Sequence, residues 1–298
     1  MKKTLLDLQH DQYGVKAIFH AVMGIVILFL GNILASLPVD LFYFITKMEV
    51  SPLILIIRPV LEIAVLLLLV CLYISKVLKL PLRDFSICKP KSILIWLACS
   101  AVLPLAVSGF FILLTPGTFS ASGLDIAKIT RIILRAVFSS CLVAGITEEL
   151  VFRGLIMHVL ELKWGKPVAI VAPSVLFGLL HIFSMKAPTG VDVLLLLIAG
   201  TGVGIMFSLI AIRSGSIWSS AIVHGIWNLI IIGGILEISI EPSSSIFTYK
   251  LISDSKLLTG GAFGIESSLP AIIGYGIVIL IAVLLRGRTF NIRGGAAS

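Results

Sequence analysis

Charged residues are scarce in this chain. Only 13% of its 298 residues are Asp, Glu, Lys or Arg, and 58% are hydrophobic, whereas a soluble domain has about 25% charged and about 45–50% apolar residues. A mean hydropathy of +1.14 leaves too little polar surface to cover a water-soluble globule of this mass. The composition therefore excludes an ordinary soluble domain and indicates that lipid surrounds most of the chain.

Acidic residues and cysteines are also few. The chain has 15 Asp and Glu residues against 23 Lys and Arg residues, which gives a formal net charge of +8. In a soluble protein this excess would suggest a nucleic-acid partner, but in a membrane protein it is typical of the positive-inside rule. We therefore predict no nucleic-acid partner. The four cysteines form no Cys-x-x-Cys pair, so they provide no redox or zinc motif.

Long apolar runs divide the chain into candidate membrane helices. These runs predict an all-α, polytopic membrane protein with about eight transmembrane helices, and we expect 1–298 to form a single transmembrane domain. The fourth run is long and begins with basic residues, so its first turns can lie at the membrane interface. The expected spans are 18–45, 52–75, 92–114, 129–160, 167–185, 191–212, 215–236 and 268–285.

The distribution of Lys and Arg predicts the orientation. With both termini in the cytoplasm, the inner segments hold about twice as many basic residues as the outer ones, as the positive-inside rule expects. The longest loop, 237–267, then lies outside the cytoplasm and is either a lid that contacts substrate or a solvated connector. The short loops and compact chain favour a bacterial plasma membrane. The acidic residues of this loop are Glu237, Glu241, Asp254 and Glu266.

Some ionisable and polar residues within the spans have a structural interpretation. Charges at bilayer depth are costly and are commonly functional. In the second span, however, Arg58 and Glu62 lie four residues apart, so they can neutralise each other within one helix. We expect the isolated Asn32 of the first span to form a hydrogen bond between helices.

The fourth span contains two adjacent carboxylates, Glu148 and Glu149, followed by Arg153. Glu149 and Arg153 are about 40° apart on a helical wheel, so they can form an ion pair. Glu148 points about 100° away from Glu149 and has to find its partner on another helix. A carboxyl group without a local partner in an apolar cavity suits a general base. Alternatively, both glutamates only brace neighbouring helices.

Two further motifs supply polar groups from other spans. Phe177 and His181 share one face of the fifth span, and His224 and Asn228 share one face of the seventh. Together with Glu148 they make the inventory of a hydrolytic site. The carboxylate can deprotonate a water molecule that His181 holds, while His224 and Asn228 donate hydrogen bonds to the oxyanion of a tetrahedral intermediate.

Zinc binding is an alternative use of the same side chains. Glu148, His181 and His224 supply one carboxylate and two imidazoles, which is a known catalytic zinc set. Zinc would lower the pKa of its bound water. The chain contains no His-Glu-x-x-His motif, so no local metal motif supports this alternative.

In this order on successive helices, the three motifs resemble those of the CPBP family of intramembrane proteases. That family includes the type II CAAX prenyl endopeptidases and the bacterial Abi proteins of bacteriocin processing and immunity. Its pattern is EExxxR, then FxxxH, then HxxxN or HxxxD, and a motif-bearing core at 130–235 contains all seven positions. The matching residues are Glu148, Glu149, Arg153, Phe177, His181, His224 and Asn228.

The resemblance implies eight helices around a conical intramembrane cavity and cleavage of a peptide bond in a membrane-associated peptide or a lipidated protein. It implies that Glu148 activates water beside His181 and that the oxyanion is bound by His224 and Asn228. It favours a glutamate-dependent mechanism that requires no cofactor, although the family has often been labelled metalloprotease. The supporting residues would be Glu149, Arg153 and Phe177.

The depth of the expected site leaves two alternatives open. Counted from the basic inner boundaries, Glu148 and His181 both lie well inside their helices. Either the fourth span projects beyond the bilayer, or the cavity is deep.

Two other classes of function remain as alternatives to a protease. A proton-coupled transporter could use the same Glu and His residues as a relay. Such transporters commonly show two halves with repeated or Gly/Pro-broken helices, and this sequence shows no such symmetry. A non-catalytic immunity or scaffold protein could retain the fold, although an intact set of site residues argues against it. The expected partners are a membrane-associated substrate and the lipid bilayer, and the sequence does not indicate the oligomeric state.

Overall fold

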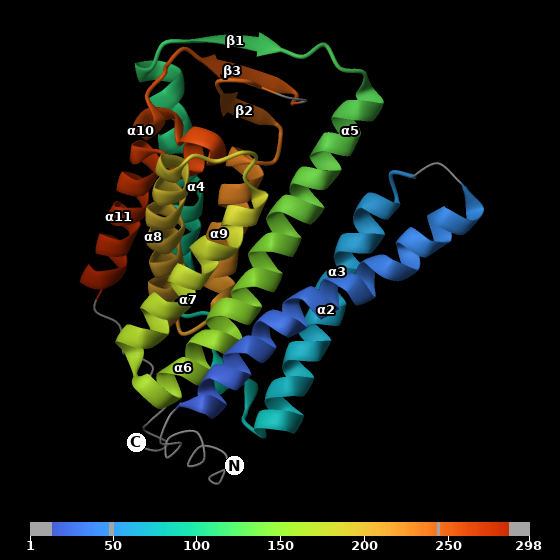
Figure 1. Ribbon diagram of the computed structural model, residues 1–298, viewed down its shortest axis with the longest axis vertical. Coiled ribbons are helices and arrows are strands. Elements are labelled where there is room, and N and C mark those ends of the chain that lie inside the picture. The colour runs from blue at the N-terminus through green and yellow to red at the C-terminus, as the bar shows by residue number, and fades with distance from the viewer. Residues whose placement is uncertain (1–13, 48–50, 243–244, 286–298) are drawn as a thin grey trace.

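The structure, a computed structural model, describes residues 14–47, 51–242 and 245–285. Helices dominate these residues (Figure 1), which confirms the predicted all-α, polytopic membrane fold. Basic residues near both termini, on which the predicted orientation partly depends, lie outside the described residues. The cytoplasmic orientation therefore stays a prediction.

Each of the eight predicted apolar runs contains a helix. Within the described residues, six helical segments are long and apolar enough to cross a membrane, and the helices of the seventh and eighth runs are shorter. Helix lengths therefore support a polytopic protein without establishing eight crossings. The helices outside the fourth run are α2 (Val15–Thr46), α3 (Ile54–Leu72) continued by η1 (Tyr73–Leu78), α4 (Ile93–Leu114), α7 (Lys166–His181), α8 (Gly190–Ser214), α9 (Ile217–Ile231) and α11 (Leu269–Leu284).

The first two helices form a pair that leans away from the rest of the bundle at one end (Figure 1). Arg58 Nη1 of α3 lies 3.2 Å from Asp40 Oδ1 of α2. Glu62 Oε1 of α3 accepts a hydrogen bond of 2.7 Å from Asn32 Nδ2 of α2. The interhelical hydrogen bond predicted for Asn32 is confirmed. The predicted Arg58–Glu62 pair is wrong, because both side chains have partners on the neighbouring helix. Spacing within one helix cannot predict such contacts between helices.

The fourth run is one continuous helical segment, Ile126–Trp164, of 39 residues. Even with the wider turns of its middle part, it is roughly 50 Å long, against a hydrocarbon core of about 30 Å. This length favours the alternative in which the fourth span projects beyond the bilayer. Its successive parts are α5 (Ile126–Leu134), the π-helical η3 (Arg135–Glu148) and η4 (Leu150–Ile156), and α6 (Met157–Trp164).

A small sheet covers the end of the molecule opposite to the start of α2 (Figure 1). β1 (Gly117–Ala121) pairs antiparallel with β3 (Phe247–Leu251), and β2 (Leu236–Ser239) pairs parallel with β3. These strands are not predictable from the sequence, because four or five residues give too short a pattern of alternation. Since β3 and most of β2 fall within the 237–267 loop, this loop is not a plain solvated connector.

Glycines let two of the helices that carry the motifs approach closely. A Cβ atom on Gly225 of α9 would lie 2.7 Å from the backbone oxygen of Cys141 in η3. A Cβ atom on Gly145 of η3 would lie 2.8 Å from the backbone oxygen of Ala221 in α9. Such small residues are typical of tightly packed membrane helices. The close approach brings the glutamates of the fourth span next to His224.

Candidate active site

Local signals begin the helices that carry the site. Pro167 lies in the first turn of α7, where a missing backbone N–H has no cost. Thr189 and Asp192 form a reciprocal capping box at the start of α8. Ser216 caps α9 by accepting a hydrogen bond from the backbone N–H of Trp218. These caps fix where each helix begins and therefore which residues face the interior.

The predicted catalytic side chains converge on one cavity of about 310 Å³. Glu148 comes from η3, His181 from α7, and both His224 and Asn228 from α9. Phe177 lines the same cavity. The structure thus brings together residues that are up to 80 positions apart in the sequence, as the three motifs predict.

Glu148 is the accessible member of the glutamate pair, with a side chain that is 24% exposed. Its Oε2 atom lies 3.9 Å from Nε2 of His224. Within the described residues this buried oxygen has no hydrogen-bond partner. Glu148 therefore faces a histidine from another helix and keeps one oxygen available to a water molecule or a substrate.

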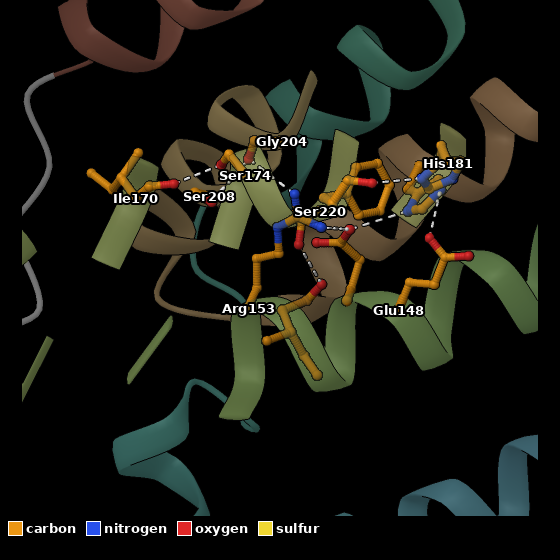
Figure 2. Close-up of polar contacts among 12 residues, drawn as sticks. Glu148, Arg153, Ile170, Ser174, His181, Gly204, Ser208 and Ser220 are labelled. Carbon is orange, nitrogen blue, oxygen red and sulfur yellow. Dashed lines mark hydrogen bonds and ion pairs between the residues drawn. The ribbon is translucent and has the colours of Figure 1, made fainter. Parts of the chain in front are cut away.

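Glu149 and Arg153 form the ion pair that their spacing predicts. Figure 2 shows Arg153 and Glu148 on the same helical segment, with the side chain of Arg153 directed toward Gly204. Arg153 Nη1 lies 2.7 Å from Glu149 Oε1, and the two side chains are 1% and 0% exposed. Arg153 Nη2 also donates to the backbone oxygen of Gly204 at 3.0 Å. A buried ion pair needs such additional hydrogen bonds to offset the cost of removing charges from water. The pair therefore ties the fourth span to α8.

The same glutamate orients a cavity histidine. Oε1 of Glu149 lies 3.1 Å from Nδ1 of His224, so Nδ1–H donates and Nε2 is directed to Glu148 and the cavity. The imidazole of His224 also stacks on Phe207, with ring centroids 4.6 Å apart. A hydrogen bond on one ring nitrogen fixes the role of the other. Glu149 thus acts on the site through His224.

The second histidine is oriented by its own helix. Nδ1 of His181 lies 2.8 Å from the backbone oxygen of Phe177. Since a carbonyl oxygen only accepts, Nδ1 carries the hydrogen, and Nε2 of the neutral ring is an acceptor. The rings of Phe177 and His181 lie 4.5 Å apart, which restricts the imidazole further.

Aromatic rings enclose the Arg153 guanidinium. Its Cζ atom lies 5.0 Å from the ring centre of Phe177, 5.2 Å from that of Phe207 and 5.7 Å from that of Phe152. Cations within about 6 Å of an aromatic face are attracted by the ring quadrupole. Phe177 therefore contacts both Arg153 and His181, which is consistent with a supporting place beside the cavity.

Part of the cavity wall consists of residues that the sequence motifs do not predict. Phe263 and Glu266 come from the 237–267 loop, and Trp227 and Tyr275 come from α9 and α11. Trp227 Nε1 donates to Glu266 Oε1 at 3.2 Å, and the Tyr275 hydroxyl donates to the backbone oxygen of Glu266 at 3.0 Å. Burial raises the pKa of the Glu266 carboxyl. The one feature of the sequence that could have indicated Glu266 is its position directly before the last apolar run.

The residues before α11 form a cover segment, 255–268, over the cavity. It contains α10 (Lys256–Thr259), η6 (Gly261–Phe263) and η7 (Ile265–Ser267). Asp192 of α8 anchors it by accepting from Lys256 Nζ at 2.9 Å and from the backbone N–H of Ala262 at 3.3 Å. The lid alternative for this part of the loop is thus supported by its position on the cavity.

The predicted zinc ligands do not form a metal-binding cluster. Within the described ranges, no group of three or more His, Cys, Asp or Glu side chains is arranged to hold a metal ion. The set Glu148, His181 and His224 therefore does not fit a three-ligand zinc centre in this arrangement.

Comparison with known families identifies the segment that carries the site. Residues 130–230 match the family model described as type II CAAX prenyl endopeptidase Rce1-like. This segment is about a third of the chain and contains all seven motif residues. A search of the curated proteins finds no match to the chain. The match supports an integral membrane peptidase of the CAAX type, and the similarity to the CPBP, CAAX-protease-like family is carried by this segment.

Proposed function

We propose that this protein is an intramembrane endopeptidase that hydrolyses a peptide bond in a membrane-associated peptide or a lipidated protein. The observation that carries the proposal is the convergence of four side chains from three helices on one cavity. These residues are Glu148, His181, His224 and Asn228.

Glu148 is the general base that activates water. Its unpartnered Oε2 takes a proton from a water molecule, and Nε2 of His181 accepts a second hydrogen bond from the same water. The water oxygen then attacks the carbonyl carbon of the substrate. General-base catalysis of this kind contributes about 10²–10⁴-fold to the rate.

The oxyanion that forms is bound by His224 and Asn228, which lie four residues apart on one face of α9. His224 does this as an imidazolium, in which Nδ1–H donates to Glu149 and Nε2–H donates to the oxyanion. Donors held in place before the reaction stabilise the developing charge without reorganisation. His224 is held by Glu149 and by stacking on Phe207. Glu149, together with Arg153, is therefore a positioning residue.

The setting of the site suggests where the enzyme acts. The cavity is largely apolar, with leucine, valine and aromatic side chains around the polar groups, so an apolar peptide segment fits it better than a charged one. We place the protein in a bacterial plasma membrane with both termini in the cytoplasm. Bacteriocin processing or immunity is the family role that suits this location.

The decisive experiment measures cleavage by the purified full-length protein in proteoliposomes, with a set of fluorogenic membrane peptides. Glu148→Ala, His181→Ala and His224→Ala should each abolish turnover while the protein stays folded. Glu241→Ala is the control, because Glu241 is exposed and away from the cavity. Wild-type turnover by the Glu148→Ala protein would refute the proposal. No cleavage by folded wild-type protein would favour the non-catalytic alternative.

Metal dependence is tested separately. We expect the active protein to contain no stoichiometric zinc and to keep its activity in 1,10-phenanthroline. Stoichiometric zinc together with chelator-sensitive cleavage would replace the metal-free mechanism with the zinc-dependent one.

A further inference from the structure

A third cavity carboxylate comes from outside the three motifs. Glu266 lies in η7 of the cover segment and lines the same cavity as Glu148. The indole of Trp227 donates to its Oε1 atom at 3.2 Å. Its backbone is held by the Tyr275 hydroxyl at 3.0 Å. Two helices, α9 and α11, therefore hold this residue against the cavity.

The two cavity carboxylates have different surroundings. Glu148 faces the imidazole of His224 at 3.9 Å. Glu266 is placed among the rings of Trp227, Phe263 and Tyr275. Burial in such surroundings favours the neutral acid and raises the pKa of Glu266. A carboxyl group that keeps its proton in a catalytic cavity can act as a general acid.

A second cavity gives Glu266 a route to solvent protons. This cavity, of about 470 Å³, shares Glu266, Phe263 and Ile232 with the catalytic cavity. Its other side is lined by the exposed Arg135 and by Glu237. Glu266 thus lies on the boundary between two cavities, where it can exchange a proton without passing through the bound substrate.

We propose that Glu266 is the general acid of the site, which protonates the nitrogen of the leaving amine when the peptide bond breaks. This inference rests on the proposed endopeptidase function. It divides proton transfer between two residues, with Glu148 as the base for water and Glu266 as the acid for the leaving group.

The step balances in protons and electrons. Water loses a proton to Glu148, and its oxygen forms a bond to the carbonyl carbon. When the tetrahedral intermediate collapses, the C–N bond breaks, its electron pair stays on nitrogen, and the nitrogen takes the proton of Glu266. Neutral Glu148 and ionised Glu266 remain. Transfer of one proton from Glu148 to Glu266 through water restores both residues.

Other titratable groups face Glu266 from the elements packed around it. They set the pH at which it loses its proton, so the test compares variants within one pH series. Histidines of α7 and α9 and the carboxylate of η3 interact with Glu266 electrostatically, and the remaining groups border it in one of the two cavities or bond its backbone. These groups are His181, His224, Glu148, Tyr275, Arg135 and Glu237.

The test uses Glu266→Gln in the full-length enzyme, because glutamine keeps an oxygen for Trp227 and cannot donate a catalytic proton. With an ordinary peptide we expect kcat to fall about 100-fold or more, while KM changes less than about threefold. The loss of kcat that sets in above the pKa of Glu266 should disappear from the pH profile of the variant. Glu241→Gln is the matched control, because Glu241 is an exposed carboxylate of the same loop.

A leaving-group comparison separates acid catalysis from a structural effect. A peptide 4-nitroanilide releases a weakly basic amine that needs little protonation, so Glu266→Gln should lose less than about tenfold in kcat with it. Equal losses for amide and anilide, or an unchanged pH profile, would overturn the inference. If Glu148→Ala is inactive at the same time, the endopeptidase proposal stands. If wild-type protein cleaves neither substrate, both proposals fail.

Discussion

Nδ1 of His224 lies 3.1 Å from Oε1 of Glu149, the same oxygen that receives Arg153 at 2.7 Å. The adjacent Glu148 approaches the other nitrogen of this imidazole at 3.9 Å. Two neighbouring glutamates therefore lie next to the two different ring nitrogens of one histidine. One is buried in an ion pair and the other borders the cavity, so their replacement should have different consequences.

Glu148→Gln and Glu149→Gln should separate activity from stability. Glutamine at 149 leaves the buried Arg153 without a counter-charge, which costs about 3–5 kcal/mol of unfolding free energy. Glutamine at 148 removes no buried ion pair, so the variant should unfold near the wild-type temperature but be inactive. Thermal unfolding in detergent and peptide cleavage measure the two effects. Equal stability of the two variants would contradict this division.

Arg153→Lys should destabilise the protein although it keeps the charge. The guanidinium uses one nitrogen for Glu149 and another for the backbone oxygen of Gly204, and an ammonium cannot reproduce this planar arrangement among three aromatic rings. We expect a loss of about 2–3 kcal/mol and reduced kcat, measured by unfolding and cleavage. Arg83→Lys, at a side chain that is 80% exposed, is the control. Unchanged stability of Arg153→Lys would show that charge alone suffices.

Gly225→Ala should disturb the packing that positions His224. The added Cβ would lie 2.7 Å from the backbone of Cys141, so α9 and η3 have to separate. Overpacking of this kind costs about 1–3 kcal/mol, and activity should fall with it. Gly202→Ala in α8 is the matched control, because its Cβ meets nothing within 4 Å and alanine favours helix. Similar effects of the two substitutions would rule out the packing explanation.

Asp192→Asn should loosen the cover segment. Asparagine weakens the charge-assisted bond to Lys256 Nζ and the reciprocal cap with Thr189. We expect faster hydrogen exchange in residues 256–267 and a lower kcat. Asp254→Asn, at an exposed position of the same loop, should leave both unchanged. Wild-type exchange in Asp192→Asn would mean that other contacts hold the segment.

The stability of the protein should depend on pH through Glu266. Burial raises the pKa of this carboxyl in the folded state, so the folded protein retains a proton that the unfolded chain has already lost. This contribution to stability is present below the unfolded pKa and is lost as the pH rises through the folded pKa. From about pH 4 to about pH 8, wild-type melting temperature should therefore fall relative to that of Glu266→Gln. A constant difference would contradict the raised pKa.

Local patterns in the sequence predicted the helices and the internal ion pair. Apolar runs mark helices because each membrane span satisfies its own backbone hydrogen bonds. The Glu149–Arg153 pair follows from spacing within one helix. The assembly of the cavity from η3, α7 and α9 agrees with the convergence predicted from the few polar residues inside the spans, to which the resemblance to a family added its own pattern.

Contacts between distant segments were not predictable in the same way. Arg58 pairs with Asp40 rather than with Glu62, because the partner helix supplies a nearer carboxylate. Glu266 and Phe263 reach the cavity through a loop whose path depends on its anchors, chiefly Asp192. The short strands were not predicted for a related reason, since β1 is stabilised by pairing with β3, which lies far away in the sequence.

The sheet has a mechanical consequence for the cavity. β3 is flanked by backbone ladders to β1 on one side and to β2 on the other, so the chain before the cover segment cannot shift without breaking several hydrogen bonds together. Between the end of β3 and the start of α11 there is no such ladder among the described residues, and side chains of α8, α9 and α11 hold the chain instead. In that stretch Gly260 and Gly264 have φ angles of +77° and +93°, which other residues rarely adopt. Substrate admission on this side would then involve a short glycine-bounded flap, while the ladder behind it stays fixed.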